Sequence, residues 1–155
     1  QVATERIQRS LIVLAPQDRV FALIADPRRT PEWLVGVRSV HVLTSGAIRV
    51  GSETSSYVNA LGRDWLARGR CVVLEPPDRI VIETSLGPGI QSRSDSRLEA
   101  LEEGKTRLIA ELAFRRPGGP FGMAFSALGV RESIENDFDR SLQKLKLFLE
   151  VSPCS

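Results

Sequence analysis

The sequence predicts an α+β fold, in which a curved antiparallel sheet of about seven strands wraps around a long C-terminal helix, with two short helices after the first strand. Two observations carry this prediction. Hydrophobicity alternates with a period of two from Val37 to Arg115, and a single helical apolar stripe then closes the chain. The 155 residues are expected to form one domain, residues 1–155.

The N-terminal segment first alternates like a strand and then becomes helical. Its expected elements are a strand from Glu5 to Leu14, a helix from Gln17 to Ala25 and a short helix from Thr30 to Leu34. Pro16 ends the strand because proline cannot donate a ladder hydrogen bond. Asp26-Pro27 separates the two helices, and Thr30 and Pro31 suit the cap and the first position of the second one.

The middle of the chain reads as a series of strands. These are expected at Val37 to Thr44, Gly51 to Leu61, Trp65 to Leu74, Arg79 to Leu86, Gln91 to Leu101 and Thr106 to Phe114. Turn residues such as Pro76-Pro77-Asp78 and Gly87-Pro88-Gly89 separate them. Connections this short favour antiparallel neighbours, because a parallel crossover needs about a dozen residues or more. The pattern therefore excludes a doubly wound sheet.

A long helix is expected from Arg131 to Val151. Its apolar stripe consists of Val130, Ile134, Phe138, Leu142, Leu145 and Leu149. A strongly twisted sheet of this size curls, and only this helix is long enough to cover its apolar face. A helix laid into the curl fills one part of the concavity and leaves the rest as a cavity.

The charge balance is nearly neutral, with a net charge of +2 from 21 basic and 19 acidic residues. It gives no reason to expect a polyanionic partner, and Arg115-Arg116 is too small a cluster for nucleic acid. No apolar run approaches the roughly 20 residues of a membrane helix, so no integral membrane segment is expected. No signal peptide is visible, and Cys71 and Cys154 are expected to be reduced thiols of a cytoplasmic protein.

Residues for acid–base, nucleophilic or metal chemistry are few. One histidine and two cysteines fall short of a structural zinc set, so no metal and no cofactor are expected. His41 is expected to face solvent, and Cys71 to behave as a small buried hydrophobe. Glu83 alternates with inward-facing isoleucines and is expected in solvent, although an inward Glu83 would be an acid with a raised pKa. No catalytic residue can be named.

Several short segments, in this order, resemble a known superfamily. They are Ala15 to Phe21, Ala25-Asp26-Pro27, Thr30 to Trp33, Val50 to Glu53, Glu75 to Ile80 and Asp139 to Glu150. The chain resembles the START-like or SRPBCC superfamily, in its polyketide cyclase/dehydrase and lipid-transport branch, over nearly its whole length. The resemblance implies the helix-grip fold. Members bind lipids, sterols, polyketides or plant hormones, and some catalyse cyclisation, dehydration or ring hydroxylation. The iron-dependent hydroxylating members use histidine ligands, which a chain with one histidine cannot match.

The strands that follow Trp65 are expected to turn small residues inward. Charged residues alternate with Ser92, Ser94 and Ser96, so the serines should face the interior. The same alternation points two further sets inward: Trp65, Ala67, Gly69, Cys71 and Val73, and Leu108, Ala110, Leu112 and Phe114. Because native cores are densely packed, small inward residues require either a closely approaching helix or a ligand, and both interpretations stand.

The strand from Gly51 to Leu61 is polar on both faces, so its orientation is undecided. If Tyr57 and Asn59 point inward, they are the best hydrogen-bonding anchors for a ligand carbonyl or hydroxyl group. If they point outward, Thr54 and Ser56 take that place.

Residues 120–129 are apolar and contain glycines. They are interpreted either as core or as a mobile lip over the cavity mouth, with Phe121, Met123 and Phe125 touching the ligand. Trp33 is expected to pack the short helices against the sheet near that mouth. The full set of candidate ligand-binding residues is Trp33, Tyr57, Asn59, Trp65, Ser92, Ser94, Ser96, Leu112, Phe121, Met123, Phe125 and Phe138.

Three functions fit these observations. The first is a binding or carrier protein for a small hydrophobic or amphipathic ligand, such as a lipid or polyketide, held in an internal cavity. The second is a metal-free enzyme of the polyketide cyclase or dehydratase type, working by positioning and a few donors, with Tyr57, Asn59 or an inward Glu83 as candidates. The third is a regulatory protein-interaction module that uses the apolar lip. The carrier is favoured over an enzyme, and either a monomer or a homodimer is compatible with the exposed edge strands.

Overall fold

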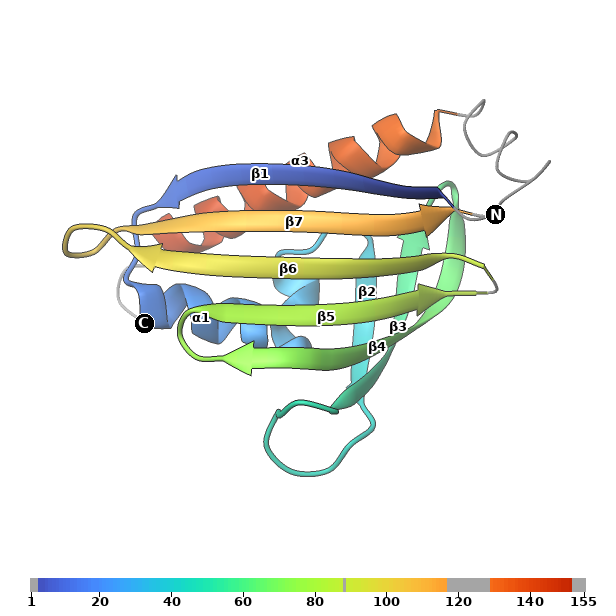
Figure 1. Cartoon of the computed structure of the whole chain (residues 1–155), viewed down its shortest axis with the longest axis horizontal. Coiled ribbons are helices and arrows are strands. Elements are labelled where there is room, and N and C mark those ends of the chain that lie inside the picture. Colours follow the sequence, from blue (N-terminus) through green and yellow to red (C-terminus); the bar gives the residue numbers. More distant parts are fainter. Residues whose placement is uncertain (1–2, 88, 117–128, 152–155) are drawn as a thin grey trace.

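A computed structural model of the chain describes residues 3–87, 89–116 and 129–151. Its helices and strands are β1 (Ala3–Val13), α1 (Gln17–Ala25), the 3-10 helix η1 (Pro27–Glu32), β2 (Val37–Val42), β3 (Glu53–Ala60), β4 (Arg63–Glu75), β5 (Arg79–Leu86), β6 (Gln91–Ala100), β7 (Thr106–Arg116) and α3 (Val130–Glu150). Figure 1 shows α3 running behind β1 and β7, on one side of the sheet.

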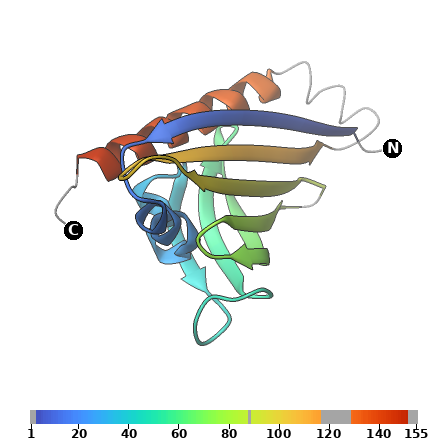
Figure 2. The ribbon, with the colours of Figure 1, turned by 60° about the vertical axis from the view of Figure 1, so that its left-hand side comes forward.

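The seven strands form one sheet in the order β1-β7-β6-β5-β4-β3-β2. Each neighbouring pair is antiparallel, and only the pairing of β1 with β7 joins strands distant in sequence. The sheet bends, so that β3 and β2 turn behind β5 and β6 (Figures 1 and 2). This curved sheet around a C-terminal helix confirms the predicted fold class.

The second short helix begins three residues earlier than predicted. The Asp26 carboxylate accepts a hydrogen bond from the backbone N–H of Arg28 at 3.0 Å, and Pro27 occupies the first helical position. Asp26-Pro27 was expected only to separate two helices. The same two residues also start η1, because aspartate caps a helix and proline fits its first turn.

A bulge in β4 changes which residues face α3. The register shifts between Cys71 and Val73, which pairs Val73 with Val81 and places Leu74 opposite Ile80. Leu74 packs against the core cluster. The prediction that Val73 points inward is therefore wrong, because the extra residue of a bulge reverses the alternation beyond it.

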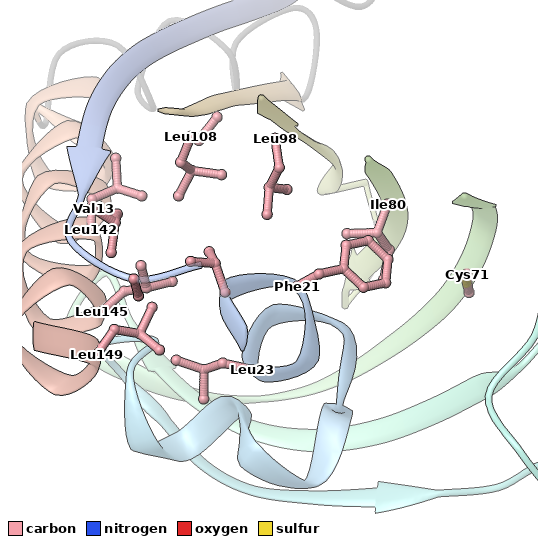
Figure 3. Packing of buried hydrophobic residues seen from close by; sticks show 13 residues of the cluster. Val13, Phe21, Leu23, Cys71, Ile80, Leu98, Leu108, Leu142, Leu145 and Leu149 are labelled. Atoms are coloured by element: carbon pink, nitrogen blue, oxygen red, sulfur yellow. The ribbon is translucent and has the colours of Figure 1, made fainter. Parts of the chain in front are cut away.

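The core lies at the C-terminal end of α3. Leu142, Leu145 and Leu149 point from the helix toward Val13 of β1 and toward α1, while Leu98 and Leu108 reach in from the sheet (Figure 3). Leu145 and Leu149 are 0% and 2% exposed. The predicted apolar stripe of the helix therefore faces the interior.

Polar contacts fix α3 along β1. The guanidinium of Arg9 contacts Asp139 at 2.8 Å and Glu135 at 3.3 Å, and Arg131 contacts Glu5 at 2.9 Å. Exposed ion pairs of this kind each contribute about 0–1 kcal/mol, so they set the position of the helix more than its stability. No helix in the described parts of the chain is long and apolar enough to cross a membrane.

Asp95 is an exception among the charged residues of β6. Its side chain is only 14% exposed, because the Arg79 guanidinium covers it and donates hydrogen bonds of 3.1 and 2.8 Å. The hydrogen bond from Arg79 is the main cause that lowers the pKa of Asp95 below its usual value. A carboxyl group with a lowered pKa in the folded state stabilises the fold above its unfolded-state pKa of about 3.9.

We therefore expect Asp95→Asn to lower the thermal midpoint by a few degrees at neutral pH. The difference between variant and wild type should persist above about pH 5 and shrink as the pH falls through the lowered pKa of Asp95. Thermal melts of both proteins from pH 7 to pH 2 measure this. A difference that stayed constant into acid would contradict the assigned role of the ionised carboxylate.

Candidate ligand cavity

A cavity of about 340 Å³ lies between the concave face of the sheet, the N-terminal half of α3 and the η1 segment. This volume is at the lower end of the range for small-molecule sites, about 300–1,000 Å³. Ile134 and Phe138 line it from α3, and Leu142 and Leu145 border it further along the helix. Leu149 is not among the lining residues and packs in the core. The apolar stripe of the helix is thus divided between a cavity wall and a packed core.

A row of hydroxyl groups crosses the sheet under the cavity. Thr54, Gly69, Thr84 and Ser92 are consecutive cross-strand partners on β3, β4, β5 and β6. A Cβ atom at Gly69 would lie 2.7 Å from Thr54 Oγ1 and 3.7 Å from Thr84 Oγ1. The missing side chain of Gly69 therefore makes a notch between two hydroxyl groups, which any larger residue would close.

Two further rows continue the same face. Ser94 lies between Ile82 and Leu112, and Ser96 lies between Ile80 and Ala110. Within the described residues, none of Ser56, Thr54, Thr84, Ser92, Ser94 and Ser96 makes a side-chain hydrogen bond, and all of them line the cavity. These hydroxyl groups are therefore available to a molecule in the cavity.

Trp33 supplies a donor on the opposite wall. Its ring lines the cavity, and its Nε1–H is buried without a hydrogen-bond partner in the described part of the chain. A buried donor without an acceptor is unfavourable by about 1–3 kcal/mol. An acceptor atom on a bound molecule would remove this penalty.

Ser141 connects α3 to the segment that carries Trp33. Its hydroxyl group donates to the Asp137 carbonyl at 2.8 Å and accepts from the backbone N–H of Val35 at 2.9 Å. Ser141 is 1% exposed. Because Val35 is two residues after Trp33, this bridge fixes the distance between the helix and the η1 wall of the cavity.

Ionisable groups are sparse in the described lining. The Cys71 thiol is buried, and burial raises its pKa, which keeps it protonated. Asp137 is 37% exposed and pairs with Arg140 at 3.5 Å. Arg70 borders the cavity through a strand position whose parity directs its side chain outward. No group of three His, Cys, Asp or Glu side chains that could hold a metal occurs among the described residues.

The structure brings together half of the predicted site residues. The residues that line the cavity are Trp33, Ser92, Ser94, Ser96, Leu112 and Phe138. The outward-facing Glu83 and exposed His41 also match their predicted orientation. Phe121, Met123 and Phe125 lie outside the described residues.

Three predicted residues lie elsewhere. Tyr57 is 53% exposed, and the Asn59 side chain donates to Asp64 at 2.9 Å on the outer face. The other parity of β3 points inward, since Thr54 pairs with the inward Gly69. Trp65 is not among the lining residues. Its Nε1–H donates to the Ala60 carbonyl at 2.9 Å, and Arg63 stacks on its ring at 4.4 Å.

Sequence reasoning missed Thr84 and Ser141. Thr84 follows Ile80 and Ile82 at a spacing of two, so alternation alone could have placed it inward. Ser141 directly precedes Leu142 of the apolar stripe, and only its contact with Val35 gives it a role. No local sequence signal indicates that contact.

Solved structures with this arrangement are numerous. An aromatase/cyclase from a Streptomyces species is 18% identical, with a TM-score of 0.77 and coverage of 96% of this chain and 94% of its own. A START superfamily protein from Mycobacterium smegmatis is 14% identical, with a TM-score of 0.73 and coverage of 94% and 97%. A protein from Chromobacterium violaceum is 24% identical, with a TM-score of 0.65 and coverage of 95% and 97%. These likenesses show the fold.

No curated protein matches the sequence significantly. The sequence pattern of the family described as polyketide cyclase/dehydrase and lipid transport, in contrast, matches residues 4–150. That match spans all the strands and helices described above except the first residue of β1. The chain therefore belongs to the polyketide cyclase/dehydrase and lipid transport family.

Proposed function

We propose that this protein binds one small, uncharged, hydrophobic or amphipathic molecule in the cavity and acts as its carrier. The observation that supports this most is the buried, unpartnered Nε1–H of Trp33 in an otherwise largely apolar wall. The hydroxyl row on the facing strands adds groups that can donate or accept. A ligand with a carbonyl or hydroxyl group on an apolar body fits both walls.

The ligand is proposed to be uncharged because no cationic side chain of the described lining points into the cavity, where it could pair with the carboxylate of an acidic ligand. Arg70 is the one basic residue in the described lining, and its side chain belongs to the outer face. A buried carboxylate without a cationic partner is strongly unfavourable. Neutral ring compounds or alcohols are therefore preferred over fatty acids, and the small volume disfavours lipids with two acyl chains.

Native mass spectrometry beside the denatured mass tests the carrier function directly. Excess mass that denaturation releases would support an occupied cavity, and thermal shifts with flavone, cholesterol and palmitate would rank the ligand classes. We expect a larger shift with a neutral ligand than with palmitate. A bare protein with no shift for any of the three would count against the carrier and favour an interaction module.

Replacing Trp33 with phenylalanine tests the role of the indole donor. The variant keeps an aromatic ring but lacks the N–H, so affinity for flavone should fall about three- to tenfold. Affinity for flavan, which lacks the carbonyl group, should change little. Isothermal titration of both ligands measures this, and Trp65→Phe, outside the cavity, is the matched control. Equal losses for flavone and flavan would indicate altered packing instead of a lost hydrogen bond.

A polyketide cyclase or dehydratase-like enzyme is the alternative, and the hydroxyl row supports it because cyclisation can proceed by positioning alone. The mass and the chromatographic retention of the released molecule, compared with those of the molecule supplied, separate the two functions. A carrier releases its ligand unchanged. An enzyme of this type returns a product that has lost water or gained a ring.

A further inference from the structure

The outer face of the sheet, opposite α3, carries a second hollow of about 550 Å³ over β1 and β4 to β7. Five arginines line it: Arg6, Arg68, Arg70, Arg93 and Arg115. The sheet separates this hollow from the ligand cavity, since its arginines alternate with inward-facing residues such as Gly69 and Ser94. It is therefore a distinct site with a different chemistry.

Two of the five arginines are neutralised locally. Arg6 pairs with Glu111 at 3.0 Å, and Arg93 pairs with Glu83 at 2.9 Å. Arg68, Arg70 and Arg115 are exposed and make no hydrogen bond or ion pair with the residues that the structure describes. Glu53 and Glu83 are the cross-strand partners of Arg70, but no ion pair joins either of them to Arg70.

Folding alone does not account for these three side chains. Arg68 and Arg70 are two residues apart on the same face of β4, where side chains lie roughly 7 Å apart and like charges repel. None of the three is buried. Glu53 and Glu83 lie on the strands beside Arg70 without pairing with it, and an anion in the hollow would offset the remaining repulsion.

The residues between the arginines can also hold an anion. One cross-strand row runs Arg68, Ser85, Gln91, Arg115 and Thr4 on β4, β5, β6, β7 and β1. It offers hydroxyl and amide donors between two guanidinium groups. Guanidinium forks match phosphate oxygens, which accept several hydrogen bonds at once.

The spacing of the row sets the size of the ligand. Arg68 and Arg115 are three strands apart, or about 14 Å between backbones. One phosphate group cannot contact both in full. We propose that this hollow binds a small molecule or a lipid headgroup that carries at least two phosphate groups.

The test compares variants in which two positively charged side chains are replaced by glutamine, either inside or outside the hollow. Arg68→Gln/Arg115→Gln removes two charges from the row. Arg28→Gln/Lys144→Gln removes two exposed charges that have no side-chain partner among the described residues and lie outside the hollow. Isothermal titration with inositol hexakisphosphate should give saturable binding to the wild type, at least tenfold weaker binding to the first variant, and a change within about twofold for the second.

A third variant, Arg68→Lys/Arg115→Lys, keeps the charge and loses the guanidinium forks, so its affinity should be intermediate. Equal weakening in both glutamine variants would overturn the proposal, because it would show a diffuse charge effect. Absence of saturable binding to the wild type would overturn it as well. Thermal melts of each variant confirm that the surface changes leave the fold intact.

Vesicle sedimentation distinguishes the two sources of phosphate. Binding to phosphatidylcholine vesicles that contain phosphatidylinositol bisphosphate, lost in Arg68→Gln/Arg115→Gln, assigns a lipid headgroup. Binding of soluble inositol hexakisphosphate without vesicle binding assigns a free polyphosphate. Equal binding to phosphatidylserine vesicles of the same total charge would contradict the requirement for more than one phosphate group.

Discussion

Replacing Leu149 with alanine is expected to lower the free energy of unfolding by about 3 kcal/mol, within a range of roughly 2–5 kcal/mol. Leu149 is 2% exposed, belongs to the core cluster and does not line the cavity. The truncation leaves an empty space that packed neighbours such as Val13 and Leu23 can fill only in part. Urea unfolding monitored by circular dichroism measures the loss.

Phe138 is the matched comparison on the same apolar stripe. Phe138 is partly buried and lines the cavity. Phe138→Leu therefore shortens a side chain that already borders unfilled space, and few packing contacts are lost. We expect a stability loss of about 1 kcal/mol or less from this change, together with weaker ligand binding. Equal stability losses for the two variants would contradict the division of the helix into a core half and a cavity half.

Ser94→Leu is expected to weaken ligand binding at least tenfold, by about 1.4 kcal/mol or more, while leaving the ligand-free protein as stable as before or more stable by about 1 kcal/mol. The Ser94 hydroxyl makes no hydrogen bond with the described residues, so its removal leaves no partner unsatisfied. The leucine side chain would occupy the cavity between Ile82 and Leu112. Flavone titration and urea unfolding of the same samples measure the two effects.

Ser10→Leu is the control for this experiment, because it makes the same substitution at an exposed position of β1 outside the cavity. It should leave ligand affinity unchanged. If Ser94→Leu bound ligand normally, the cavity would not be the binding site. If it lowered the free energy of unfolding by more than about 2 kcal/mol, the space beside Ser94 would be too small to accept a leucine.

The fold could be predicted because its signals are local and repeated. Alternation in residues 91–114 and the helical stripe of residues 130–149 each fix one inward face without any tertiary information. The six predicted site residues that line the cavity lie at the short helix, on β6 and β7, and on α3, where the polar and apolar parities differ clearly.

The errors occurred where alternation carries no preference or is interrupted. In β3 both parities are polar, so Tyr57 and Thr54 could not be ranked, and pairing with Gly69 decides between them. In β4 the bulge reverses the alternation after Cys71, and no residue there is a recognisable bulge signal.

The hollow on the outer face of the sheet, called the arginine hollow after the five arginines that line it, could not be predicted for a different reason. Its five arginines come from four strands, β1, β4, β6 and β7, and the sheet order β1-β7-β6-β5-β4 brings them together. A net charge of +2 averages over the whole chain and conceals such a cluster. Charged residues at alternate strand positions can be assigned to one site only when the register between the strands is known.

The alternation of β4 and β6 also constrains how this chain can change length. Neighbouring residues such as Arg93 and Ser94 belong to opposite faces, the first to the hollow with the five arginines and the second to the ligand cavity. An insertion or deletion of one residue within β6 would move the following side chains to the opposite face of the sheet. Serines would then face solvent, and arginines would face the interior. The same change in the turn at residues 102–105 would affect neither face. The two sites therefore depend on the same register through the pleat of one sheet, and Arg70, Thr84 and Ser92 border both of them.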